Sequence, residues 1–90
     1  MAVKTIKLEI VAPEGIFYTG DATMVELNTT EGEIGVYPGH IPMTMIAVPG
    51  TLTITENDDK KRADLNCGFL EIQEEKMTIL AEEIKWAGSF

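Results

Sequence analysis

Apolar and polar residues alternate along most of this chain, and this alternation restricts it to a β-sheet fold. In the first alternating segment, Ile6, Leu8 and Ile10 share one side of an extended backbone. The same pattern returns in four later pairs of apolar residues: Val25 and Leu27, Leu52 and Ile54, Ala63 and Leu65, and Leu70 and Ile72. Each segment therefore predicts a strand with one buried face and one solvated face.

Turn-forming residues separate these segments at short intervals. They occupy positions 13–15, 19–21, 38–39, 49–50, 57–59 and 74–76. Short strands at this spacing predict roughly eight to ten antiparallel strands in a sandwich or barrel. No segment keeps a helical period for three turns, and residues 79–86 are typical of a last strand with a short exit. We therefore expect one all-β domain, with an ordered core over about residues 4–84 and an exit segment over 85–90.

Composition narrows the function classes. The chain has 90 residues, is 44% hydrophobic and carries a net charge of −8. It lacks the run of about 20 apolar residues that spans a membrane, and no secretory signal is visible. A single cysteine excludes an internal disulfide framework. The acidic balance disfavours nucleic acid and anionic lipid, which are bound through lysine and arginine, and suits a basic partner.

Residues for independent catalysis are scarce. The chain has one serine, Ser89, beside its C-terminus, so a serine triad is not expected. Cys67 and His40 offer a cysteine–histidine dyad, but Cys67 opens an apolar strand, where a small buried cysteine is the common case. No calcium loop or phosphate loop is present in the sequence. We therefore expect no enzyme activity and no cofactor, and a small hydrolase built on this dyad is the least favoured alternative.

One soft-metal pattern competes with an ordinary core explanation. His40, Met43 and Met45 are residue types that bind copper(I). On a strand, however, both methionines point to the same side, which favours two core-filling side chains and no metal site. A free-standing β-sandwich that binds a soft metal or a peptide remains the alternative function.

The segment over residues 31–42 has the most specialised composition, reading EGEIGVYPGHIP. It holds three glycines, two prolines and the only histidine of the chain. Glu31 and Glu33 flank a bend, so their carboxylates are expected to point outward. Pro42 disfavours the helical region for Ile41, which predicts an extended, rigid stretch. Loops shaped in this way more often bind a partner than merely join strands.

This segment resembles the signature of the epsilon subunit of rotary ATP synthases, a motif of the form EGE-(Leu/Ile)-G-(Ile/Val)-Tyr-PGH. The resemblance covers about residues 6–86, and it includes residues 11–13, 17, 20, 49–50, 68–72 and 78–81 in the expected order. Two departures stand out. Cys67 replaces a usual glycine, and the chain stops at Phe90, where the family continues into two helices.

The resemblance implies a ten-stranded antiparallel β-sandwich or flattened barrel, here with the C-terminal helical hairpin absent. It also implies a non-catalytic subunit of the central stalk, which couples proton or sodium flow to ATP synthesis. Glu31 and Glu33 would face the c-ring, and His40, Ile41 and Pro42 would lie toward the gamma subunit. Without the helices, no ATP binding is expected.

The same resemblance implies where the protein works. It would be peripheral at the cytoplasmic face of the bacterial plasma membrane, with membrane association only through the complex. A gamma-facing apolar patch could also pair with itself when the isolated domain lacks its partner.

Overall fold

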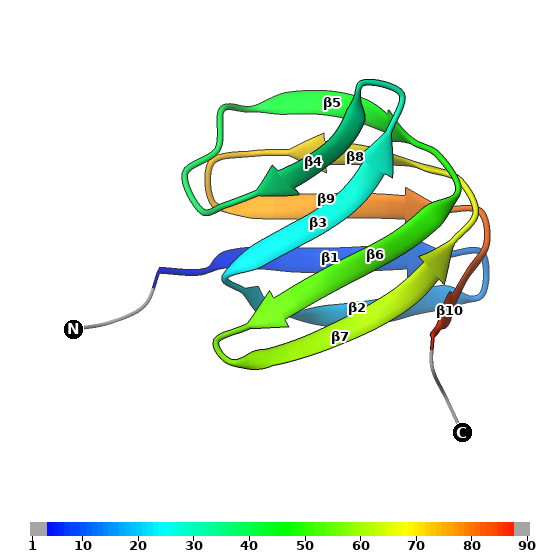
Figure 1. Ribbon diagram of the computed structural model, residues 1–90, viewed down its shortest axis with the longest axis horizontal. Helices are drawn as coiled ribbons and strands as arrows, with labels where there is room; N and C mark the ends of the chain where they lie inside the picture. The colour runs from blue at the N-terminus through cyan, green and yellow to red at the C-terminus, as the bar shows by residue number, and fades with distance from the viewer. Residues whose placement is uncertain (1–3, 88–90) are drawn as a thin grey trace.

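Ten strands make up the part of the chain that the computed structural model describes, residues 4–87 (Figure 1). They are β1 (Ile6–Ala12), β2 (Gly15–Ala22), β3 (Met24–Thr29), β4 (Gly32–Val36), β5 (Met43–Ala47), β6 (Gly50–Glu56), β7 (Asp59–Leu65), β8 (Gly68–Ile72), β9 (Lys76–Ala81) and β10 (Ile84–Trp86). No helix occurs within these residues. The predicted exit segment begins inside β10, and residues 88–90, including Ser89, lie outside the described part.

The strands form two layers that meet at one corner. Their order is β10-β7-β6-β3-β5-β8-β9-β1-β2, and β4 pairs with the remaining edge of β3. The corner lies between β3 and β5, which share a single pair, Thr29 with Ala47. One layer therefore holds β4, β3, β6, β7 and β10, and the other holds β5, β8, β9, β1 and β2 (Figure 1). This confirms the predicted sandwich or flattened barrel.

One strand pair differs from the antiparallel expectation. β1 runs parallel to β9, with pairs from Lys7–Lys76 to Val11–Leu80, whereas the other strand pairs are antiparallel. A tight turn makes β2 the antiparallel neighbour of β1, and β9 takes the opposite edge of β1. Alternation fixes which face of a strand is buried, but it carries no information on the direction of a distant neighbour.

The core fills the space between the two layers. All eleven alternating apolar residues predicted for one face are buried, and none is more than 3% exposed. Three smaller side chains join them, namely Ala22, Ala47 and Ala81. Phe17, Tyr18, Ile34, Met45 and Ile84 pack against this cluster from its margins. Two apolar faces thus enclose one continuous core, which supplies most of the stabilisation of a domain this small.

β10 and β2 stand at the two ends of the strand order, and side chains close the seam between them. The Phe17 ring on β2 stacks on the Trp86 ring of β10, with centroids 4.6 Å apart, and Tyr18 meets Trp86 edge-on at 6.0 Å. The Tyr18 hydroxyl donates to the Glu56 carboxylate at the end of β6. Lys61 Nζ lies 3.0 Å from the other Glu56 oxygen. These contacts cover the free edge of β2, where no backbone ladder continues.

The seam predicts a pH-dependent stability. Partial burial, and then the bond to Glu56, raise the pKa of Tyr18 above its ordinary value near 10. The bonds from Tyr18 and then Lys61 lower the pKa of Glu56 below its ordinary value near 4.5. The contribution of Glu56 to the free energy of unfolding is fully present above about pH 4.5, and it is lost as the pH falls through the lowered pKa of Glu56. The Tyr18 contribution is present below about pH 10 and is lost as pH rises further.

We expect Tyr18→Phe to lower the free energy of unfolding by about 1 kcal/mol at neutral pH, because it removes a partly exposed bond to a charged group. The native protein is expected to lose stability as the pH rises above about 10, and Tyr18→Phe should remove the part of this loss that Tyr18 causes. Urea denaturation across a pH series measures both effects. Tyr37→Phe is the matched control, because Tyr37 is exposed and makes no side-chain hydrogen bond within residues 4–87. Equal behaviour of the two variants would contradict this account of the seam.

Candidate protein-interaction surface

The turn between β3 and β4 holds Glu31 outward at its tip. The Thr29 hydroxyl accepts a hydrogen bond from Glu31 N at 3.0 Å and donates one to the Gly32 carbonyl at 2.9 Å. Gly32 has a φ of 106°, which strains any other residue. Glu33 follows on β4 with its side chain exposed. Both predicted acidic residues are therefore solvent-facing, on a turn that its own hydrogen bonds hold rigid.

The loop between β4 and β5 presents the second group of predicted residues. His40 N donates to the Tyr37 carbonyl at 3.2 Å, and Gly39 has a φ of 83° at the third position of this turn. Gly39 N donates to the Glu74 carbonyl at 3.2 Å, which ties the loop to the turn between β8 and β9. His40 Nδ1 donates to the Ile41 carbonyl at 2.8 Å. The Ile41 side chain is 75% exposed.

The predicted residues do not form one cluster. Glu31 and Glu33 lie at the start of β4, whereas His40, Ile41 and Pro42 follow its end. Five residues at about 3.3 Å each separate the two groups by roughly 17 Å. The structure therefore offers two separate contact points at opposite ends of one edge strand.

A third surface feature is an exposed apolar patch, whose residues were not predicted from the sequence. The pairings Ile46–Phe69, Phe69–Leu80, Leu80–Val11 and Val11–Ile16 place five apolar residues side by side across β5, β8, β9, β1 and β2. Four of them are 45–66% exposed, and Val11 is half-buried. We call Ile46, Phe69, Leu80, Val11 and Ile16 the apolar row. A contiguous exposed patch of this kind marks an interaction site more often than scattered apolar residues do.

Carboxylates border the apolar row. Glu71 and Glu9 occupy the next outward positions, and Thr78 pairs with both of them. Lys76 Nζ lies 3.8 Å from a Glu9 oxygen. On the other side, Glu82 lies in the same groove as Leu80. An apolar centre with an acidic rim fits a protein surface that has an apolar centre and a basic rim.

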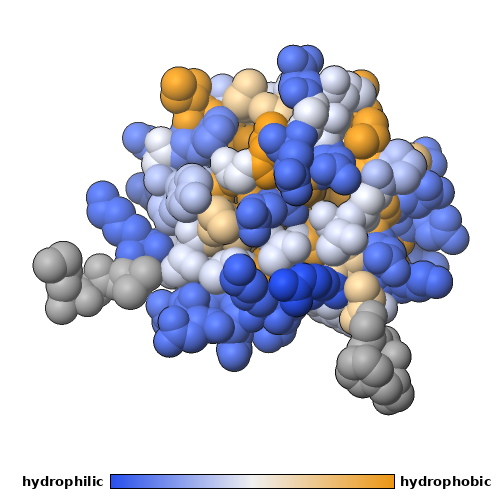
Figure 2. Space-filling view, viewed as in Figure 1, coloured by the Kyte–Doolittle hydropathy of each residue, from blue (hydrophilic) through white to orange (hydrophobic). Residues whose placement is uncertain are grey.

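Among residues 4–87, the opposite layer has no comparable row of exposed apolar side chains. On the face that β3, β4, β6 and β7 form, most side chains are hydrophilic or intermediate, and hydrophobic ones gather toward the upper margin (Figure 2). The face that carries the apolar row belongs to the other layer, so the two outer faces differ in polarity. This difference singles out one face for contact with a partner.

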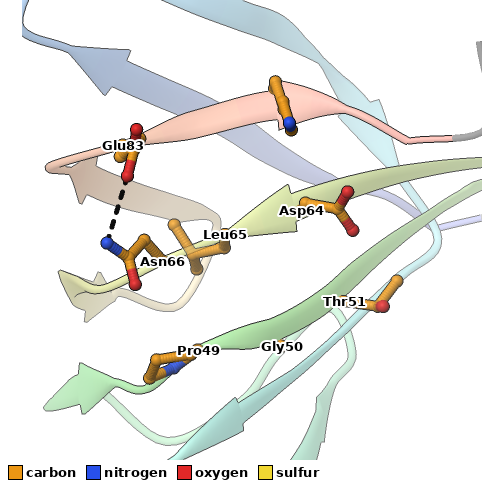
Figure 3. A pocket seen from close by; sticks show the side chains of 8 residues that line it. Pro49, Gly50, Thr51, Asp64, Leu65, Asn66 and Glu83 are labelled. Carbon is orange, nitrogen blue, oxygen red and sulfur yellow. Dashed lines mark hydrogen bonds between the residues drawn. The ribbon is translucent and has the colours of Figure 1, made fainter.

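A pocket of about 340 Å³ lies between β6, β7 and β10 (Figure 3). Asp64 and Lys85 line it, and Asn66 Nδ2 donates to Glu83 Oε1 at 3.1 Å across its rim. The lining includes neither cysteine nor histidine. Over residues 4–87 no group of three His, Cys, Asp or Glu side chains is placed to hold a metal ion. The pocket therefore shows no constellation of groups for nucleophilic or metal-assisted chemistry.

Cys67 differs from its expected burial. Its side chain is half-exposed, because Cys67 lies just before β8 begins. The thiol donates to Glu82 Oε1 at 3.1 Å, and this bond raises the pKa of Cys67, which disfavours the thiolate. His40 lies beyond the Met43–Ile72 end of the β5–β8 ladder, and Cys67 lies beyond the Ala47–Gly68 end. The two side chains cannot form a dyad.

The expectation of two core-filling methionines is wrong for Met43. Met43 is 40% exposed at the start of β5, whereas Met45 packs against the core. Met43 is the first residue of β5 and pairs with Ile72, the last residue of β8, so its side chain lies at the end of the ladder, where it reaches solvent. His40 Nδ1 donates to the Ile41 carbonyl, so only Nε2 of this ring is left as a possible ligand for the soft-metal alternative.

Comparison with known proteins assigns the family. The family model described as ATP synthase, delta/epsilon chain, beta-sandwich domain matches residues 5–87. The chain belongs to the ATP synthase delta/epsilon family. Among residues 4–87, this delta/epsilon-family chain has no helix long and apolar enough to cross a membrane.

Several similar relatives are ATP synthase epsilon chains. The protein from Corynebacterium aurimucosum is 45% identical over 84 residues, a match that covers 91% of this chain and 69% of that protein. The protein from Alkalihalophilus pseudofirmus is 35% identical over 80 residues, which cover 89% of this chain. The delta/epsilon-family chain spans 60% of the length of that second relative.

Solved structures show the same fold. A chain of the Euglena gracilis mitochondrial ATP synthase, from a structure of its OSCP, F1 and c-ring, matches with a TM-score of 0.88 at 20% identity. The match covers 96% of this chain and 56% of that chain. A chain from the central stalk and c-ring of the Tetrahymena thermophila mitochondrial ATP synthase matches with a TM-score of 0.78 at 11% identity, covering 94% and 69%. At these identities the likeness shows the fold of the delta/epsilon-family domain alone.

Proposed function

We propose that this chain is a non-catalytic coupling component of the central stalk of an ATP synthase. It links the gamma subunit to the c-ring, so that proton or sodium flow drives ATP synthesis. The observation that carries this proposal is the apolar row with its acidic rim, on a domain of the delta/epsilon family. A surface of this composition serves docking, and within residues 4–87 no group of three His, Cys, Asp or Glu side chains is placed to hold a metal ion.

The fold suits a part that transmits force. The two layers share one closely packed core, and the turns that carry Glu31 and His40 are tied down by hydrogen bonds. Close-packed interiors have low compressibility, so a load applied at one end of the domain reaches the other with little deformation. In our proposal the apolar row and the stretch from His40 to Pro42 face gamma, and Glu31 and Glu33 face polar or basic loops of the c-ring.

The proposed location follows from these partners. The domain sits peripherally at the cytoplasmic face of the bacterial plasma membrane and reaches the membrane only through the complex. When the isolated domain lacks gamma, the exposed apolar row is expected to favour self-association.

An affinity-tagged chain incubated with solubilised host membranes tests the proposal. The expected result is recovery of gamma together with other ATP synthase subunits, at an amount equal to the bound chain. A second incubation with purified gamma alone separates direct binding from co-recovery of the whole complex. Failure to recover gamma in both incubations would overturn the proposed function.

Reversal of one charge tests the proposed contact between the c-ring and the turn that carries Glu31 and Glu33. We expect Glu33→Lys to weaken binding of the gamma–chain complex to the purified c-ring about fivefold, since one exposed ionic contact contributes up to about 1 kcal/mol. The effect should shrink at high salt, because exposed charges are screened. The control is Asp58→Lys, which makes the same charge change in the turn between β6 and β7, at the opposite end of the same layer. Equal weakening by both variants would indicate a general charge effect and contradict a contact at Glu33.

A further inference from the structure

β5 has one edge without a neighbouring strand. β8 pairs with β5 along its whole length, whereas β3 reaches β5 only at the Thr29–Ala47 pair. Two backbone bonds flank that pair: Thr30 N donates to the Ile46 carbonyl at 3.0 Å, and Val48 N donates to the Asn28 carbonyl at 3.1 Å. In Figure 1, β5 forms the upper margin of the ribbon, with the turn between β3 and β4 beside its end.

These two bonds show which backbone groups of β5 point away from β8. Groups on one edge of a strand come from every second residue, so Ile46 and Val48 face the open edge together with Thr44. Thr44 N–H, Thr44 C=O and Ile46 N–H therefore point outward. Within residues 4–87 none of these three groups has a hydrogen-bond partner. They form a short template for another strand.

This edge lacks the usual protection. Natural sheets guard their edges with charges, prolines or covering segments, because open edges recruit other strands. β4 carries Glu33, β10 carries Lys85, and the aromatic seam covers β2. β5 reads MTMIA and has neither a charge nor a proline. An uncharged open edge on a monomer is a liability, which argues that a partner covers it in the assembled protein.

A groove runs along the same edge. It has a volume of about 480 Å³ and is lined by Thr30, Glu31, Met43, Thr44, Met45, Ile46 and Phe69. Its walls are mainly apolar, and Ile46 and Phe69 belong to the apolar row as well. Glu31 is the only charged residue of the lining, and no basic residue compensates it. The groove thus suits an extended apolar segment of the same partner that covers the apolar row, and Glu31 marks its end toward the proposed c-ring contact.

We propose that β5 accepts an extended segment of the gamma subunit as an added strand. The backbone of that segment pairs with Thr44 and Ile46, and its apolar side chains pack on Ile46 and Phe69. Strand addition supplies affinity through main-chain bonds and specificity through alternate side chains. The inference rests on the proposed function, because gamma is the partner named there.

A proline substitution tests the pairing directly. Thr44→Pro removes an N–H that points to the open edge and leaves the ladder with β8 intact, and proline is tolerated on edge strands in this position. Purified gamma is expected to bind Thr44→Pro at least tenfold more weakly than the unsubstituted chain. Thr44→Val keeps both the N–H and the shape of the side chain, so its affinity should stay within about twofold. Thermal denaturation of both variants checks that they are folded.

Hydrogen exchange on the unsubstituted chain provides a second readout that does not depend on a variant. The amides of Thr44 and Ile46 are expected to exchange at least tenfold more slowly when gamma is bound. If gamma binds and Thr44→Pro binds equally well, or these amides gain no protection, strand addition is wrong while the proposed function stands. Protection by the isolated c-ring instead of gamma would also overturn the inference. Absence of any gamma binding to the unsubstituted chain would defeat the proposed function itself.

Discussion

Ile79→Ala is expected to lower the free energy of unfolding by about 3–4 kcal/mol. Ile79 is fully buried in the middle of β9, and its neighbours in register are Leu70 on β8 and Ile10 on β1, both also fully buried. The substitution removes three buried carbon atoms and leaves a cavity in the shared core. A domain of this size has a total stability of roughly 5–13 kcal/mol, so the loss is a large share of it.

The adjacent residue provides the control. Leu80 is 51% exposed on the outer face of the same strand, and Leu80→Ala should change the free energy of unfolding by less than about 1 kcal/mol. Urea denaturation of both variants measures the difference, and the slope of the transition should remain unchanged. If the two substitutions had equal effects, the assignment of inner and outer faces on β9 would be wrong.

Phe69→Ala is expected to weaken binding of purified gamma by at least thirtyfold, which corresponds to about 2 kcal/mol. Phe69 lies in the apolar row between Ile46 and Leu80, and it is the aromatic member of that row. Large aromatic side chains near the centre of an interface contribute much of its binding free energy. Isothermal titration calorimetry measures the affinity, and denaturation should show only a small change in stability because the ring is 45% exposed.

The control for Phe69 lies on the other layer. Thr51 is exposed on the outward face of β6, and Thr51→Ala should leave the affinity for gamma unchanged within about twofold. If Phe69→Ala bound gamma as tightly as Thr51→Ala, the apolar row would not be the docking surface. Phe69→Ala and Thr44→Pro also separate two contributions, because the first removes side-chain packing and the second removes a backbone bond.

Much of the fold was predictable because strand alternation reports burial directly. Ile6, Leu8 and Ile10 are inward in the sequence pattern and fully buried in the structure. The outward placement of Glu31 and Glu33 also followed from local chemistry, since a glycine-containing bend leaves charged side chains in solvent. These features depend only on residues that are close together in the chain.

Other features depend on long-range pairing and were not predicted. The five members of the apolar row come from five strands, and only the register between those strands brings them together. A signal was nevertheless present: the alternation breaks where Ile79 precedes Leu80 and where Phe69 precedes Leu70. One residue of each such pair must face outward. Met43 and Cys67 departed from expectation because both lie at strand ends, where the core gives way to solvent.

The pairing of β1 with β9 has a consequence for biosynthesis. Lys7 meets Lys76, so the chain must leave the ribosome at least as far as Lys76 before this central part of the layer can assemble. Translation proceeds at about 5–20 residues per second, and the N-terminal hairpin therefore waits several seconds with one side of β1 unpaired. During that interval the nascent chain exposes Ile6, Leu8 and Ile10 to other molecules. Molecular chaperones that shield apolar segments during translation would have their main opportunity here.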